Sequence, residues 1–194
     1  MMLRTILLLT LGTPAWADCP VAGDLDSGVR LLYENGTAEL YRQQRPAVVA
    51  MTSTFSDGYE SRAMLGQGVY LLEVVDLVAG EADPSSRVTY AFDMTPDAMP
   101  VPSPGAKWRA RTIVDRMDQE KLTASWDDAA KMVFGECAYT VIAGTMHYAA
   151  ADYSYTERLH FFPDLGFAYL ASFDDHELEE PEVYRLVSMS VVAQ

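Results

Sequence analysis

The chain has 194 residues, 49% of them hydrophobic, and its 28 acidic against 14 basic side chains give a formal net charge of −14. This length is enough for one domain with a substantial core. A field of that sign repels phosphate backbones and anionic lipid surfaces, so we expect no nucleic-acid partner.

The start of the chain has the three parts of a secretory signal peptide. Residues 1–4 are a short basic start, residues 5–11 are an apolar run too short to span a bilayer, and residues 15–17 are a small-x-small cleavage site. A buried N-terminal helix is the alternative, but a glycine and a proline follow the apolar run and would break it. We therefore expect cleavage near Ala17, a periplasmic or secreted protein, and one β-rich domain over residues 18–194 without an integral membrane segment.

Both cysteines, Cys19 and Cys137, lie in the mature chain. An exported protein with an even number of cysteines normally pairs them, so we predict a Cys19–Cys137 disulfide. A metal site or two free thiols are the alternatives. Because the chain has no Cys-x-x-Cys motif, we expect the bond to be structural and not a redox catalyst.

The first structural signal is a hairpin around the Asn-Gly dipeptide at residues 35–36, which readily adopts the positive φ angles of a type I′ turn. A two-residue turn pairs Leu31 with Leu40 on one face of the hairpin. The same turn pairs Leu32 with Glu39 on the other face. We therefore expect Glu39 to point away from the core.

Further strands follow in the first half of the chain. Residues 48–55 and 59–65 form a second expected hairpin around an Asp-Gly turn. Residues 69–78 are an apolar, valine-rich run that suits a strand near the centre of the sheet. After the alternating residues 88–93, four prolines within residues 94–106 exclude an interior strand and predict a connector that divides the domain into two halves.

The second half contains one ambiguous stretch and one clear hairpin. Ser125 or Asp127 could cap a short helix that ends before Gly135, or, as we favour, residues 127–130 form a turn leading back into a long strand. Residues 138–148 and 153–162 alternate as two strands of a hairpin. A loop between them places Met146 opposite Tyr155 on an apolar face.

The same register gathers polar side chains on the opposite face of that hairpin. They are Thr145, His147, Thr156, Arg158 and His160. His147, Arg158 and His160 are candidate ligand-binding residues, for an anion or, with a carboxylate from another strand, for a metal. Scattered surface histidines are the alternative and the commoner case.

An acidic loop provides the other candidate site. Residues 174–182 hold six carboxylates in nine positions, and Asp174, Asp175 and Glu177 are the candidate ligands for a divalent cation. The spacing and central glycine of an EF-hand are absent. A charge run ahead of a proline is usually a solvated loop, which is the interpretation we prefer.

Motifs that carry chemistry are absent from the sequence. It contains no Gly-x-Ser-x-Gly elbow, no His-Glu-x-x-His, no phosphate-binding glycine loop and no dinucleotide fingerprint. We therefore assign no catalytic residue and expect no cofactor. A hydrolase site assembled from distant carboxylates or histidines remains an alternative.

Turn and strand signatures are spread along the mature chain: the Asn-Gly hairpin, residues 68–72, the proline connector before Trp108, residues 135–139 and residues 162–166. In these signatures the chain resembles a family of uncharacterised β-rich periplasmic proteins of Gram-negative bacteria. The resemblance implies a similar fold and a periplasmic location. It carries no active-site motif.

These patterns predict an all-β domain of about ten to twelve antiparallel strands in hairpins, forming a curved sheet or half-open barrel with little helix. Such a sheet can enclose an apolar groove, lined by tyrosines, methionines and Phe161, Phe167 and Phe173. We expect an exported, non-enzymatic binding or envelope-associated protein with an apolar or lipid-like ligand. A hydrolase, or a module that binds or inhibits another exported protein, is the alternative.

Overall fold

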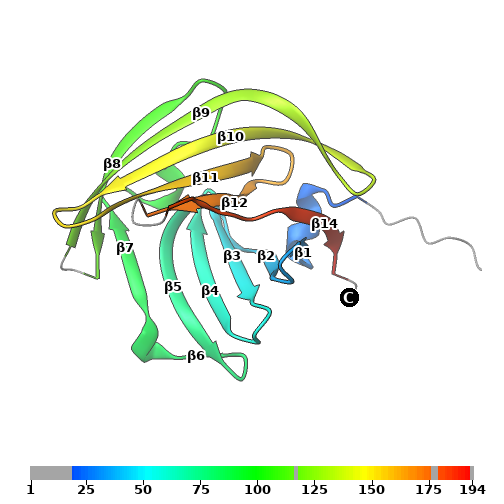
Figure 1. The fold of residues 1–194 in the computed structure, drawn as a ribbon, viewed down its shortest axis with the longest axis horizontal. Coiled ribbons are helices and arrows are strands. Elements are labelled where there is room, and N and C mark those ends of the chain that lie inside the picture. The colour runs from blue at the N-terminus through cyan, green and yellow to red at the C-terminus, as the bar shows by residue number, and fades with distance from the viewer. Residues whose placement is uncertain (1–18, 116–117, 176–178, 193–194) are drawn as a thin grey trace, which may run out of the picture.

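The computed structural model describes residues 19–115, 118–175 and 179–192, which form one antiparallel sheet (Figure 1). The strand order is β13-β12-β11-β10-β9-β8-β7-β5-β4-β3-β2-β1-β14, and β6 pairs with β5 alone. The described helical segments are the short 3-10 helices η1 (Ala22–Asp26), η2 (Pro84–Ser86) and η3 (Pro96–Ala98). The predicted all-β class is confirmed.

The sheet has fourteen strands, more than the sequence predicted, because two of them are only two residues long. The strands are β1 (Val29–Tyr33), β2 (Ala38–Arg45), β3 (Val48–Thr54), β4 (Glu60–Gly66), β5 (Tyr70–Val78), β6 (Glu81–Ala82), β7 (Val88–Phe92), β8 (Lys107–Val114), β9 (Asp118–Phe134), β10 (Cys137–Ala149), β11 (Ser154–Phe162), β12 (Phe167–Asp174), β13 (Glu182–Val183) and β14 (Leu186–Val191). Strands on both sides of the proline connector belong to this one sheet.

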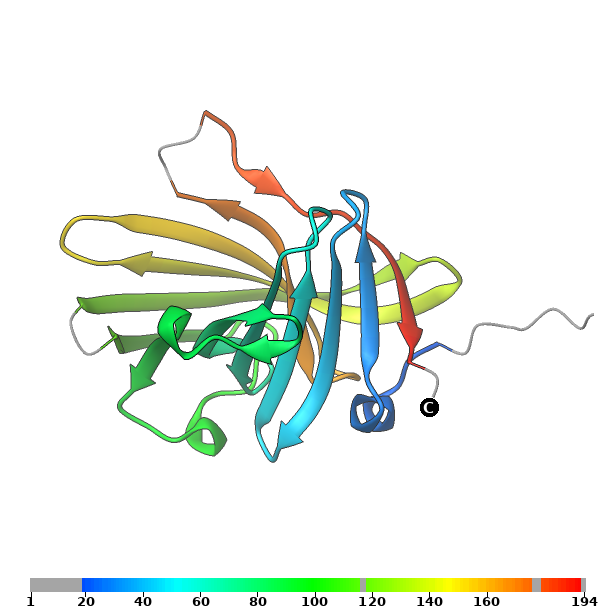
Figure 2. The ribbon, with the colours of Figure 1, turned by 90° about the horizontal axis from the view of Figure 1, so that it is seen from below.

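The sheet curves over on itself without closing. In Figure 1, β8–β12 arch over β1–β5, and in Figure 2 the two groups of strands run across one another. The two edge strands, β13 and β14, are consecutive in the chain. Between them, the Tyr184 N–H donates to the Ala171 carbonyl, while the Arg185 carbonyl accepts from the Glu34 N–H, both at 2.9 Å. Residues 184 and 185 therefore link the two edges of the sheet through one hydrogen bond to each side, although the edges do not pair along their length.

Buried side chains form two clusters between the curved parts of the sheet. The first contains Leu31, Tyr41 and Phe167, which come from β1, β2 and β12. The second contains Trp126 and Phe161, from β9 and β11. Both clusters join side chains that are far apart in sequence, so the curvature of the sheet is held by apolar packing.

The long strand β9 corrects the interpretation of residues 127–130. The strand runs without interruption from Asp118 to Phe134, so neither the helix nor the favoured turn forms. Its pairing with β10 is irregular between Ile142 and Gly144, where a bulge lets both strands bend. A Cβ atom added at Gly144 would lie 2.3 Å from the ring of Trp126, so glycine makes room for the indole at this bend.

The hairpin of β10 and β11 keeps its predicted faces but not its predicted register. Met146 pairs with Glu157 instead of Tyr155, and Tyr155 pairs with Tyr148. A shift by two residues preserves the alternation, because successive side chains of a strand point to opposite faces. The polar face that holds His147 is therefore confirmed, although its cross-strand partners differ.

The predicted disulfide between Cys19 and Cys137 is confirmed, and it joins residues 118 apart in sequence. It ties the segment before η1 to the first residue of β10. The predicted signal peptide, residues 1–17, lies outside the described residues. Among the residues that are described, no helix has the length and apolar character needed to span a bilayer.

The turn between β4 and β5, which contains Gly68, contacts the turn between β11 and β12, which contains Gly166. The Ala168 N–H donates to the Gly68 carbonyl at 2.9 Å. A Cβ at Gly68 would lie 2.2 Å from the Gly166 carbonyl oxygen, and the φ of Gly68 is +66°. Both the backbone angle and the close approach therefore require glycine at position 68. This contact holds the two parts of the sheet together beside the cavity described below.

Candidate functional site

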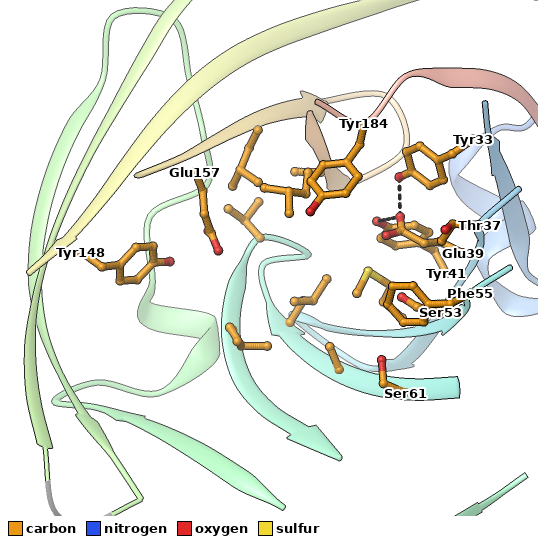
Figure 3. Close-up of a pocket in the computed structure, with 18 residues that line it drawn as sticks. Tyr33, Thr37, Glu39, Tyr41, Ser53, Phe55, Ser61, Tyr148, Glu157 and Tyr184 are labelled. Carbon is orange, nitrogen blue, oxygen red and sulfur yellow. Dashed lines mark hydrogen bonds between the residues drawn. The ribbon is translucent and has the colours of Figure 1, made fainter. Parts of the chain in front are cut away.

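A cavity of about 270 Å³ lies between β1–β5 and β10–β12 (Figure 3). Its apolar lining is contributed by Met51, Phe55, Ala63, Leu65, Val69, Leu71, Leu159, Ala168 and Leu170. Its polar lining consists of four tyrosines, one threonine, two serines and the carboxyls of Glu39 and Glu157. No lysine, arginine or histidine belongs to the described lining.

Three phenylalanines predicted to line an apolar groove do not line this cavity. Phe167 stacks on Tyr41, with 4.1 Å between ring centroids, and Phe161 packs edge-on against Trp126. Phe173 packs on a tyrosine ring of β11. The predicted lining was therefore wrong for the phenylalanines. The predicted tyrosines and a methionine, Met51, do line the cavity, together with aliphatic side chains.

The β1–β2 hairpin brings Glu39 into the cavity, whereas the sequence predicted it on the outer face. The loop has three residues, because the Tyr33 N–H donates to the Thr37 carbonyl at 2.9 Å and Gly36 ends the loop with a φ of 86°. Such loops combine a type I turn with a glycine in the left-handed region. The extra residue shifts the register by one, so that Glu39 pairs with Leu31 and both share the inner face.

Two tyrosine hydroxyls hold the Glu39 carboxyl (Figure 3). Tyr33 donates at 2.5 Å and Tyr41 at 2.7 Å, both to Oε2. Burial raises the pKa of Glu39 above its ordinary value, against the opposing effect of these two hydrogen bonds. Burial and the neighbouring carboxyl also raise the pKa of each tyrosine. Both hydroxyls therefore keep their protons and act as donors.

Glu157 lies at the opposite side of the cavity, close to Tyr148 (Figure 3). It occupies the same face of β11 as Tyr155 and Leu159. Within the described part of the chain, its carboxyl has no hydrogen-bond or ion-pair partner. Burial, followed by the nearby Glu120 charge, raises the pKa of Glu157 from 4.5 to about 7.

Glu120 adds a second carboxyl within electrostatic reach of Glu157. Its side chain is only 2% exposed, and its Oε1 accepts a hydrogen bond of 2.7 Å from the Tyr153 hydroxyl. Its Oε2 has no hydrogen-bond partner among the described residues. Nearby, the rings of Tyr148 and Tyr155 stack with 4.7 Å between centroids. This side of the cavity therefore combines the half-buried Glu157 and the buried Glu120 with aromatic rings, and no basic side chain among the described residues lines it.

The raised pKa of Glu157 predicts that stability falls as the pH rises from about 4.5 to about 7. In this range the folded protein retains a proton that the unfolded chain has released, so the unfolded state binds fewer protons. Above this range the penalty is constant. Replacing Glu157 with glutamine should flatten this part of the profile and increase the free energy of unfolding by roughly 2 kcal/mol near pH 8.

Urea unfolding of the wild type and of Glu157→Gln between about pH 4 and 8 measures this effect. Glu81→Gln, at an exposed position on β6, is the control and should follow the wild-type profile. If Glu157→Gln and the wild type show parallel profiles, Glu157 does not carry a raised pKa.

His147, Arg158 and His160 lie on the face of β10 and β11 opposite to Glu157 and engage protein groups. The His160 Nδ1 is 2.7 Å from the Tyr169 hydroxyl, and burial, followed by the Arg158 charge, lowers the pKa of His160. Arg158 donates to Thr145 Oγ1 at 2.8 Å and forms an ion pair with a carboxylate of β9. His147 contacts a threonine hydroxyl across the hairpin at 3.2 Å. Ligand binding by these three residues stays a prediction.

The acidic loop is only partly described. Asp174 ends β12, Asp175 follows it, and Glu177 lies outside the described residues. Over the described ranges, no group of three or more histidine, cysteine, aspartate or glutamate side chains is arranged to hold a metal ion. Cation binding by this loop stays a prediction.

The cavity is the feature that best suits a functional site, because it brings together carboxyls and apolar side chains from both parts of the sheet. Sequence reasoning missed both Glu39 and Glu157. An acid at position 157 interrupts an otherwise apolar alternation, and this signal could have found it. Comparison of the chain with known protein families, curated protein sequences and solved structures finds no match.

Proposed function

We propose that this chain is an exported, non-enzymatic binding protein that holds a small ligand with an apolar body in the cavity between the two parts of the sheet. The observation that carries the proposal is the apolar lining of the cavity, which β3, β4 and β5 contribute on one side and β11 and β12 on the other. Protein interiors are normally packed to crystal-like density, so an open apolar space of about 270 Å³ is unusual as a purely structural feature. This volume lies just below the usual range for ligand pockets, about 300 to 1,000 Å³, and therefore suits a small ligand.

Export is the second part of the proposal. A disulfide between Cys19 and Cys137 is typical of proteins that work in an oxidising compartment. The signal-peptide pattern of residues 1–17 and the resemblance to periplasmic β-rich proteins support the same location. The ligand would therefore be encountered in the periplasm or outside the cell.

Binding of the neutral, apolar fluorophore N-phenyl-1-naphthylamine tests this function. The mature chain, purified and freed of bound lipid, should increase the probe's fluorescence along a saturable curve that corresponds to one probe per chain. The reason is that an apolar cavity excludes the water that quenches the probe. A linear, non-saturating response from correctly folded protein would contradict the proposal.

A further inference from the structure

The cavity contains negative groups without positive partners. Glu39 and Glu157 line it, whereas no lysine, arginine or histidine does so within the described residues. The ion pairs that the structure shows lie elsewhere, at Arg87–Glu73, Arg158–Asp127 and Arg185–Glu34. Burying a carboxylate without a compensating charge is costly, and the side chains that line the cavity supply no such charge to Glu39 or Glu157.

The two lining carboxyls differ in how far their own neighbours satisfy them. Glu39 receives two tyrosine hydroxyls on one oxygen. Glu157 receives no hydrogen bond from any described residue, and the buried Glu120 nearby leaves one oxygen without a partner. The Glu157 carboxyl is therefore the group to which a ligand can supply the missing hydrogen bond and positive charge.

The negative charge of the cavity favours some apolar ligands over others, according to the charge of their polar group. Fatty-acid anions would be repelled by Glu39 and Glu157 and by the net charge of −14. A protonated amine would be attracted by the same groups. Charge complementarity therefore points to a cationic ligand.

We propose that the ligand is an organic amine with an apolar body, whose ammonium group binds the Glu157 carboxylate beside Tyr148. This inference rests on the proposed function, because it assumes that the cavity is the binding site. Leu159 lies two residues from Glu157 on the same face of β11, and Leu170 is its partner on β12. These two side chains continue the wall away from the carboxylate and contact the apolar body.

Three ligands with the same octyl chain test the proposal: octylamine, octanol and octanoate. Each is titrated near pH 8 against protein loaded with N-phenyl-1-naphthylamine, and its ability to displace the probe is measured. Octylamine, which is protonated at this pH, should bind at least about tenfold more tightly than octanol, and octanoate should bind most weakly.

The results separate the two proposals. If the probe binds but octanol or octanoate competes as well as octylamine, the amine proposal is overturned and the cavity remains a binding site. If the probe itself does not bind and octylamine also fails in direct calorimetric titration, both proposals fail.

Glu157→Gln identifies the carboxylate responsible. This nearly isosteric change should lower the affinity for octylamine by about tenfold and should lower the affinity for the uncharged octanol much less, because only the amine carries a charge that pairs with the carboxylate. Glu81→Gln, at an exposed position, should behave as the wild type. Equal octylamine affinity in Glu157→Gln and the wild type would overturn the assignment of Glu157.

The pH dependence of octylamine affinity distinguishes a binding role of Glu157 from a purely structural one. The groups that interact with Glu157 are Glu120 on β9 and the tyrosines Tyr90, Tyr148, Tyr155 and Tyr184, and the raised pKa values of these tyrosines keep them neutral. Octylamine affinity should therefore increase about tenfold from near pH 6 to near pH 8 as Glu157 loses its proton. Glu157→Gln should abolish this increase. An unchanged profile in that variant would contradict the proposal.

Discussion

Replacing Cys19 and Cys137 together with serine should lower the free energy of unfolding by about 4 to 5 kcal/mol. The bond closes a loop between residues 118 apart in sequence, so its loss restores much conformational freedom to the unfolded chain. It also releases the segment before η1 from β10. Urea unfolding, with the slope compared between variants, measures the change.

The reductant dithiothreitol provides the control for the disulfide. It should destabilise the wild type by an amount similar to that of the double substitution and leave the double variant unaffected. A loss of less than about 1 kcal/mol in the double variant would contradict this expectation and show that other contacts, such as the hydrogen bond from the Tyr139 hydroxyl to the Pro20 carbonyl, hold the N-terminal segment to β10.

Filling the cavity should reduce ligand binding by about tenfold to a hundredfold. Met51 lines the cavity from β3, and Met51→Trp would place an indole in the space that the ligand needs. Forcing a ligand against an added ring costs about 1 to 3 kcal/mol, which corresponds to this change in affinity. Titration with N-phenyl-1-naphthylamine measures the effect.

The neighbouring position supplies a matched control. Thr52 follows Met51 on β3 and therefore points to the other face of the sheet, where it pairs with Arg62. Thr52→Trp introduces the same side chain without entering the cavity and should bind the probe as the wild type does. Thermal unfolding of both variants shows whether they are folded. Wild-type affinity in a folded Met51→Trp protein would place the ligand elsewhere.

Local sequence signals predicted most of the β-structure. Alternation of side chains marked the strands, and glycine dipeptides marked hairpins at Gly36 and Gly58, because few other residues adopt positive φ at low cost. The continuous strand at residues 127–130 was missed, since two adjacent aspartates suggest a turn. Asp127 instead pairs with Arg158 of β11, a partner that becomes visible only when the strands are assembled.

The candidate site was harder to predict, because it depends on turn length and on sheet curvature. Glu39 changes face when the hairpin loop has three residues instead of two, and an Asn-Gly dipeptide is compatible with both loops. Glu157 was not singled out, because nothing in the sequence around it indicates that β11 curves back toward β2. The contact of Gly68 with Gly166, which helps to hold this curvature, is also non-local.

The most direct test of the binding function is a crystal structure of residues 18–194 with octylamine. The account predicts the octyl chain in the cavity, against Leu159 and Leu170, with the ammonium nitrogen within hydrogen-bond distance of the Glu157 carboxylate. A well-ordered structure in which the cavity holds only water, or in which octylamine binds elsewhere, would contradict it.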